Sequence, residues 1–168
     1  MADTTDALIR ATALGVVAGM RSQLPLALLC LAARQRNQDH PNLPRVLASP
    51  KVTAFLLASA AGELVVDKLP FTPSRLMPGS LVVRAGVGSL AGALLARQSG
   101  RQPVIGAALG AAGALAGSYA GHDVRAGLAA ATGAPDPLLA VLEDVTAVAI
   151  GGYAVGLTGL PGRADATR

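Results

Sequence analysis

Five apolar segments, separated by loops that contain Pro, Gly or Arg, constrain the fold more than any other feature of the sequence. They cover approximately residues 8–33, 52–69, 81–96, 103–121 and 137–157. A helix of about 20 apolar residues crosses the ~30 Å hydrocarbon core of a bilayer. We therefore predict one all-α domain over residues 1–168: a polytopic transmembrane helical bundle of about five spans, with a short polar tail at 158–168.

Composition supports lipid rather than water as the surroundings. Charged residues make up 14% of the chain, against about 25% in a typical soluble domain. Aromatic residues contribute only 2%, although large side chains normally dominate a water-soluble core. Ala, Leu, Val and Gly supply the apolar content instead, which suits helices that pack closely within a membrane.

The first apolar segment is interrupted by Pro25. As one helix it would be about 39 Å long, enough to cross the bilayer with a kink. Each part on its own is too short to cross. The segment is therefore either one kinked span or a re-entrant pair of half-helices, and both alternatives remain open.

Small residues recur at helical spacing in the third and fourth segments. Gly88 and Gly92 are four residues apart, and the fourth segment carries a longer series at Gly106, Gly110, Gly113, Gly117 and Gly121. Residues three or four apart share a helix face, and small residues on such a face let helix backbones approach within a membrane. This stripe predicts tight packing and no chemistry.

Basic residues near the segment ends predict the topology, because they concentrate in cytoplasmic loops. Eight lie on one side of the five-span arrangement: Arg34, Arg36, Arg45, Lys51, Arg97, Arg101, Arg163 and Arg168. Four lie on the other: Arg10, Lys68, Arg75 and Arg125. We therefore expect a multi-pass protein of the inner (cytoplasmic) membrane with a cytoplasmic C-terminus. A re-entrant first segment would move the N-terminus to the cytoplasmic side and strengthen this bias.

Charged residues within or beside the apolar segments are the candidate functional residues. They are Arg21, Glu63, Asp67, Lys68, Arg75, Arg84, Arg125, Glu143 and Asp144. A charge at the bilayer centre costs about 2.5–3.5 kcal/mol on the insertion scale, so these side chains should face inward and pair. We expect Arg21 to have an acidic partner from the second or the fifth segment. Buried pairs can also serve only to fix helix register, and Arg84 and Lys68 lie where they could snorkel to the interface.

Other classes of function find little support. No Walker loop, HExxH or GxSxG spacing occurs, so we expect no enzyme activity, no cofactor and no metal site. The single Cys30 gives neither a disulfide nor a Cys-based metal site. The basic residues are dispersed over loops without interleaved aromatics, which speaks against nucleic-acid binding.

Several of these motifs together resemble a known family. They are Ala18-Gly19-Met20-Arg21-Ser22 with Pro25, Gly62-Glu63-Leu64 through Asp67-Lys68-Leu69-Pro70, Pro73-Ser74-Arg75, and Glu143-Asp144. Nearly the whole chain is similar to a bacterial membrane family catalogued as domain of unknown function 4126. The resemblance implies a small polytopic membrane protein and supplies no mechanism.

Two functions follow from these observations. In the first, the charges form an internal site of a transporter or channel for a small ion or an anionic lipid headgroup. Arg21 and Arg75 would receive an anion, and the acidic residues would relay protons. In the second, the protein is a non-transporting membrane scaffold or assembly factor whose ion pairs only specify packing. The lipid bilayer is the expected partner in both, and a homo-oligomer is compatible with either.

Overall fold

The computed structural model describes residues 4–35, 44–66 and 76–157, with side chains omitted at 64–66. Within these ranges the chain forms six α-helices and one short 3-10 helix. In chain order they are α1 (Thr4–Met20), α2 (Leu24–Gln35), η1 (Arg45–Ala48), α3 (Pro50–Val66), α4 (Pro78–Gln98), α5 (Pro103–Thr132) and α6 (Asp136–Val155). The predicted all-α class is confirmed.

We predicted about five spans, and within the described residues three helices are long and apolar enough to cross a membrane: α4, α5 and α6. Each begins with Pro at one of its first two positions. A backbone N–H at these positions would have no hydrogen-bond acceptor within the helix, so its absence in Pro costs nothing. Helices α5 and α6 end at Gly133 and Gly156, which both have positive φ, a conformation that glycine adopts without strain.

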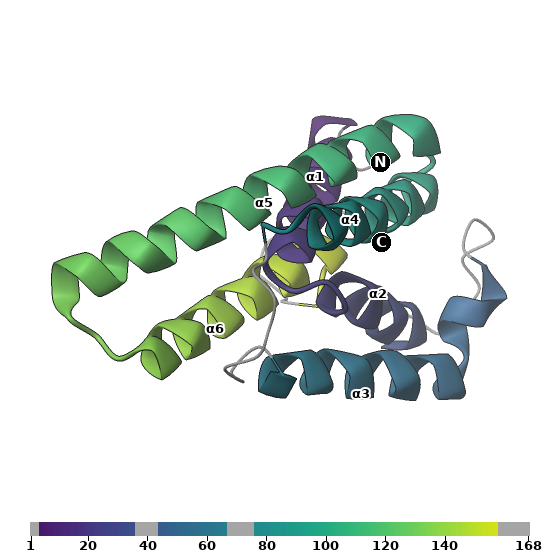
Figure 1. The fold of residues 1–168 in the computed structure, drawn as a ribbon. Coiled ribbons are helices and arrows are strands. Elements are labelled where there is room, and N and C mark those ends of the chain that lie inside the picture. Colours follow the sequence, from purple (N-terminus) through teal and green to yellow (C-terminus); the bar gives the residue numbers. More distant parts are fainter. Residues whose placement is uncertain (1–3, 36–43, 67–75, 158–168) are drawn as a thin grey trace, which may run out of the picture.

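The centre of the bundle is built from α1, α4 and α5, which lie against one another (Figure 1). A side chain added at Gly88 or Gly92 of α4 would overlap the backbone of α5 at Gly110 or Gly106. Added at Gly113 or Gly117, it would overlap the backbone of α1. The predicted packing stripe is confirmed, and it serves two interfaces rather than one.

The first apolar segment is two helices that double back on each other. Val17 of α1 and Leu28 of α2 both lie against Gly151 of α6. Eleven residues along one straight helix would separate them by about 16 Å. Helix α6 runs antiparallel to α1, since Asp144 meets Arg21 and Tyr153 meets Arg10. This geometry agrees with a pair of half-helices and not with one kinked helix, and we call α1 and α2 together the re-entrant hairpin, after the alternative that the sequence left open.

The fourth apolar segment is longer than expected. We predicted that it ends near Gly121, but α5 continues to Thr132. The predicted length was that of one bilayer span. The Ala-rich sequence after Arg125 instead favours a continuing helix, which ends at Gly133. The second half of α5 and the first half of α6 therefore form a hairpin that projects from the bundle (Figure 1).

Candidate functional site

The site is organised around the break between α1 and α2. A helix continuing from α1 would place the Pro25 ring against the carbonyl group of Arg21 and would lack one hydrogen bond. The chain therefore leaves the helix after Met20 and re-enters it at Leu24. Such a break exposes carbonyl groups at the end of α1 and N–H groups at the start of α2, and all of them need partners when buried.

Glu63 of α3 satisfies the start of α2. Its Oε1 accepts hydrogen bonds from the backbone N–H of Ser22 at 2.7 Å and from the Ser22 hydroxyl at 2.6 Å. Its Oε2 accepts one from the backbone N–H of Gln23 at 2.9 Å. A carboxylate at this position also complements the partial positive charge of the helix N-terminus. Glu63 is thus the anionic cap of the re-entrant helix.

Arg84 and Ser118 satisfy the end of α1. Arg84 Nη1 donates to the Gly19 carbonyl oxygen at 2.6 Å. The Ser118 hydroxyl lies 3.2 Å from the same oxygen and 2.9 Å from the Ala114 carbonyl oxygen of its own helix, so its one proton is shared between them. Arg84 Nη2 also lies 3.9 Å from Glu63 Oε1. Arg84 is only 5% exposed, so it turns into the bundle rather than snorkelling outward. Its positive charge complements the negative end of the α1 dipole.

Arg21 pairs with Asp144 of α6. Its Nε donates to Asp144 Oδ1 at 2.6 Å, and Nη2 contacts the same oxygen. Arg21 is 1% exposed and is the largest fully buried side chain in the described part of the molecule. The expectation that Arg21 has an acidic partner from the second or fifth apolar segment is confirmed. The partner comes from the fifth.

A second charged group lies between α5 and α6. Arg125 holds Asp136 through two hydrogen bonds, Nε to Oδ1 at 2.9 Å and Nη2 to Oδ2 at 2.5 Å. Arg125 Nη1 also lies 3.6 Å from Glu143 Oε2. Glu143 is adjacent in sequence to Asp144, so the two charged groups meet α6 at neighbouring positions, although side chains at successive positions of a helix do not face each other.

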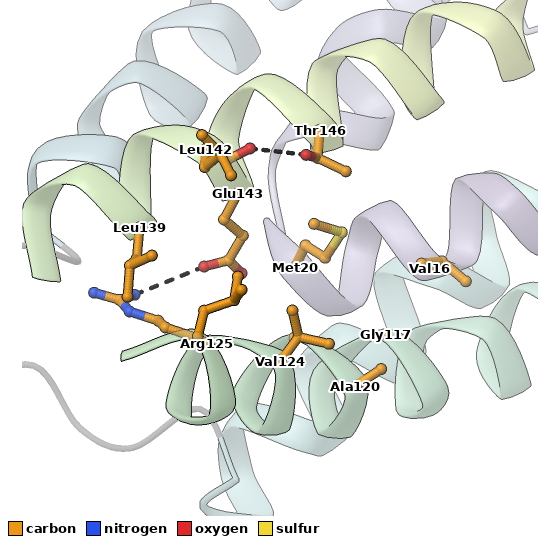
Figure 2. Close-up of a pocket in the computed structure, with 12 residues that line it drawn as sticks. Val16, Met20, Gly117, Ala120, Val124, Arg125, Leu139, Leu142, Glu143 and Thr146 are labelled. Carbon is orange, nitrogen blue, oxygen red and sulfur yellow. Dashed lines mark hydrogen bonds and ion pairs between the residues drawn. The ribbon is translucent and has the colours of Figure 1, made fainter. Parts of the chain in front are cut away.

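A cavity of about 230 Å³ opens beside this second group. Figure 2 shows Arg125 and Glu143 reaching toward each other across it, with Val124 on α5, Leu142 on α6 and Met20 on α1 forming its walls. Met20 immediately precedes Arg21, so the cavity borders the tip of the re-entrant hairpin. Arg21, Glu63 and Arg84 do not line it.

Six of the nine residues singled out from the sequence lie in the described ranges, and all six take part in these two charged groups. The other three, Asp67, Lys68 and Arg75, lie outside the described residues. Sequence reasoning missed Ser22, Ser118 and Asp136. Ser118 could have been found as a polar residue within the glycine-rich stripe. The roles of Ser22 and Asp136 depend on partners 41 and 11 residues away.

The chemistry that the site offers is ionic and hydrogen bonding. Among the residues that the structure describes, no group of three His, Cys, Asp or Glu side chains is placed to hold a metal ion. The carboxylates can accept protons, and the arginines provide fixed positive charge.

Residues 8–158 match a family model described as Domain of unknown function (DUF4126). The chain belongs to this family. The DUF4126 match includes every residue of the two charged groups and the re-entrant hairpin from Leu8 onward. No curated protein and no solved structure matched the chain in the corresponding searches.

Proposed function

We propose that this DUF4126 protein is a multi-pass protein of the bacterial inner membrane that transports a small ion through the charged region at the tip of its re-entrant hairpin. Its membrane location is supported by the three long apolar helices and by large apolar side chains that face outward, among them Phe55, Val82, Val104 and Val145. Exposed apolar surface on this scale is typical of a protein that contacts lipid.

The re-entrant hairpin increases the difference in basic residues between the two predicted sides of the membrane. It brings the start of α1 to the same end of the bundle as the end of α6, where Arg10 lies over the Tyr153 ring. If the hairpin does not cross the membrane, Arg10 moves to the side that already had eight basic residues. The predicted count on the two sides then changes from eight against four to nine against three. The positive-inside rule then favours a cytoplasmic position for this end of the bundle.

The depth of the charges supports a role inside the membrane. Arg84 is six residues from the start of α4, and Asp144 is eight residues from the start of α6. At 1.5 Å per residue, they lie about 9 and 12 Å inward from those helix ends. Ionisable side chains at such a depth are costly and commonly mark ion or proton pathways.

The observation that carries the proposal is the position of Glu143. It belongs to the second charged group, where it pairs with Arg125, and it also lines the cavity that borders the hairpin tip. A carboxylate that has a charged partner on one side and a cavity on the other can exchange a proton or a cation without dismantling the bundle. An anion at Arg21, which the sequence also allowed, has less support because Asp144 already occupies that guanidinium.

The scaffold function is the second candidate, and a different observation favours it. Glu63, Arg84 and Arg21 satisfy the backbone groups and charges at the helix break. The contacts of these three residues at the helix break explain their presence without any transported ion. A scaffold would need nothing more from them.

Proton flux in reconstituted vesicles separates the two candidates. Vesicles loaded with a pH-sensitive dye, and driven by a potassium gradient with valinomycin, should acidify faster with the protein than without it. Glu143→Gln should remove most of this flux. Asp123→Asn is the matched control, because Asp123 is an exposed acid on α5, and it should leave the flux intact. Folded protein with no flux above empty vesicles would favour the scaffold, and flux unchanged by Glu143→Gln would exclude this site.

A further inference from the structure

The cavity between α5, α6 and the end of α1 leads from the outer surface of the bundle to its interior. Val124 and Leu142 line it and are 59% and 56% exposed, whereas Met20 and Leu139 line it and are buried. Figure 2 shows these four side chains around one space, on three different helices. All four are apolar, and apolar walls bind the apolar part of a ligand.

The polar side chains of the lining already have partners in the protein. Arg125 and Glu143 carry opposite charges, and Arg125 Nη1 lies 3.6 Å from Glu143 Oε2. The Thr146 hydroxyl donates to the Leu142 carbonyl oxygen of its own helix at 2.8 Å. The charges of the lining are therefore in balance. An uncharged apolar ligand fits this lining best, because a charged one would lose its hydration without gaining an unpaired opposite charge.

The depth of the cavity matches the region of a bilayer that acyl chains occupy. Helix α6 begins at Asp136, whose side chain is 74% exposed. Its lining residues run from Leu139 to Thr146, three to ten residues further along, which corresponds to about 4–15 Å at ~1.5 Å per residue. One leaflet contributes about 15 Å, half of the ~30 Å hydrocarbon core. If the charged start of α6 lies at the membrane surface, the cavity lies at the depth of the acyl chains of one leaflet.

The volume of the cavity suits part of one acyl chain. About 230 Å³ is roughly eight times the ~30 Å³ that one water molecule occupies in the liquid. If a methylene group needs about the same space as a water molecule, the cavity holds about eight methylene groups. A linear chain can place a segment of this length in the cavity while the rest of the molecule stays in the bilayer.

We propose that this cavity holds an acyl chain of a membrane phospholipid, which enters past Val124 and Leu142 and reaches Met20 at the hairpin tip. The surrounding bilayer supplies this ligand, since the exposed apolar side chains at the entrance are those that would face lipid. The inference rests on the membrane location that is part of the proposed function, and it does not need transport. A chain in this position would cover Glu143, so an ion could reach that carboxylate only after the chain had left.

Gly121 gives direct control over the cavity that it lines. A Cβ atom added there would lie 3.4 Å from Glu143 Oε1 and 3.9 Å from Met20 Cγ. Both are ordinary van der Waals distances, so Ala fits at this position, whereas the larger side chain of Leu would extend into the cavity. Gly127, on the same helix, has open space around its added Cβ and provides a matched control.

Photolabelling in vesicles tests the inference. The full-length protein is reconstituted with a phosphatidylcholine that carries a diazirine on one acyl chain, and is irradiated, unfolded and digested with trypsin. The tryptic peptide 11–21 contains Val16 and Met20, which line the cavity, and none of its residues is exposed. We expect the wild type to be labelled on this peptide, because the cavity lets an acyl chain reach it.

The tryptic peptide 76–84 is the internal control. It contains Val82 and Val83, which are exposed on the outside of α4, and it should be labelled in every variant. Gly121→Leu should reduce the labelling of peptide 11–21, relative to peptide 76–84, at least about tenfold, equivalent to about 1.4 kcal/mol of binding free energy. Gly121→Ala should give a smaller reduction, and Gly127→Leu none. A phosphatidylglycerol with the same photoreactive chain should label as well as the phosphatidylcholine, because the charges of the lining are balanced.

Three results would overturn the inference. Labelling of peptide 11–21 that both Gly121 variants leave unchanged would show that the chain arrives by another route. A wild-type protein labelled on peptide 76–84 and unlabelled on peptide 11–21 would show that no chain enters the cavity. Labelling of peptide 11–21 by phosphatidylglycerol alone would identify the headgroup, rather than the acyl chain, as the recognised part.

The same experiment separates this inference from the proposed function. Absence of label from peptide 76–84 would refute the membrane location, and both proposals with it. Labelling through the cavity without proton flux would uphold the acyl-chain site and refute transport. Flux with an unlabelled peptide 11–21 would do the reverse.

Discussion

The Arg21–Asp144 pair allows a quantitative test of how the bundle tolerates charge. Replacing Arg21 with Met leaves the Asp144 carboxylate in a site where its side chain is 14% exposed. Replacing Asp144 with Asn leaves the guanidinium, which is almost wholly buried. Removing one partner of a buried pair typically costs about 3–5 kcal/mol, because the other charge is then uncompensated. Each single variant should lose stability in this range.

The double variant should lose much less than the sum of the two single losses. Neither charge then remains, and Met is close in size to the Arg stem, so the cost is the packing defect of about 1–2 kcal/mol, in the range of tolerated core substitutions. The double-mutant cycle should therefore give a coupling energy of several kcal/mol. The Asp6–Arg10 pair is the matched control, since it joins two residues of one helix with side chains 16% and 23% exposed. Its coupling should be about 0.3–0.5 kcal/mol.

Equilibrium unfolding in mixed micelles of lipid and sodium dodecyl sulphate, followed by circular dichroism, measures these free energies. Identical titrations of the wild type, two single variants and double variant complete each cycle. Additive losses at Arg21 and Asp144, with a coupling no larger than that of Asp6 and Arg10, would refute the argument. Such a result would mean that water reaches both charges in the unmodified protein.

Three further measurements address packing, topology and burial. Gly117→Leu should destabilise the protein by about 1–3 kcal/mol through overpacking, whereas Gly86→Leu should not, because nothing lies within 4 Å of its added Cβ; equal melting temperatures for the two variants would contradict this. Reporter fusions at Arg45 and Arg168 should both report the cytoplasm, and periplasmic activity at either would reverse the assigned topology. Cys30 is 0% exposed, so a maleimide should label it only on unfolding, and rapid labelling of folded protein would show that α2 opens.

The sequence was informative wherever one local pattern decided the outcome. The spacing of Gly106, Gly110, Gly113 and Gly117 predicted a packing face, and the structure places helix backbones against it. The cost of a buried charge predicted an acidic partner for Arg21, and Asp144 is that partner. Both inferences need only helix periodicity or a desolvation energy, and neither depends on knowing the tertiary structure.

Features that depend on the three-dimensional arrangement of the helices could not be predicted from local sequence patterns. Pro25 predicted a break but not the direction of the following helix, because the reversal is fixed by contacts such as Leu28 with Gly151. The length of α5 was underestimated because the apolar segment was ended near residue 121, just before Asp123 and Arg125. Those charges are compatible with a continuing helix, since Arg125 finds its partners on α6.

The long separation between Arg21 and its partner affects how the protein is made. Asp144 is 123 residues further along the chain than Arg21. At about 5–20 residues per second, the ribosome needs about 6–25 s to make that intervening length. During this interval the first two helices are already synthesised while the buried arginine has no Asp144 to neutralise it. The Arg21–Asp144 contact can therefore form only after α6 has been made, and the hairpin lacks it while α3, α4 and α5 are synthesised.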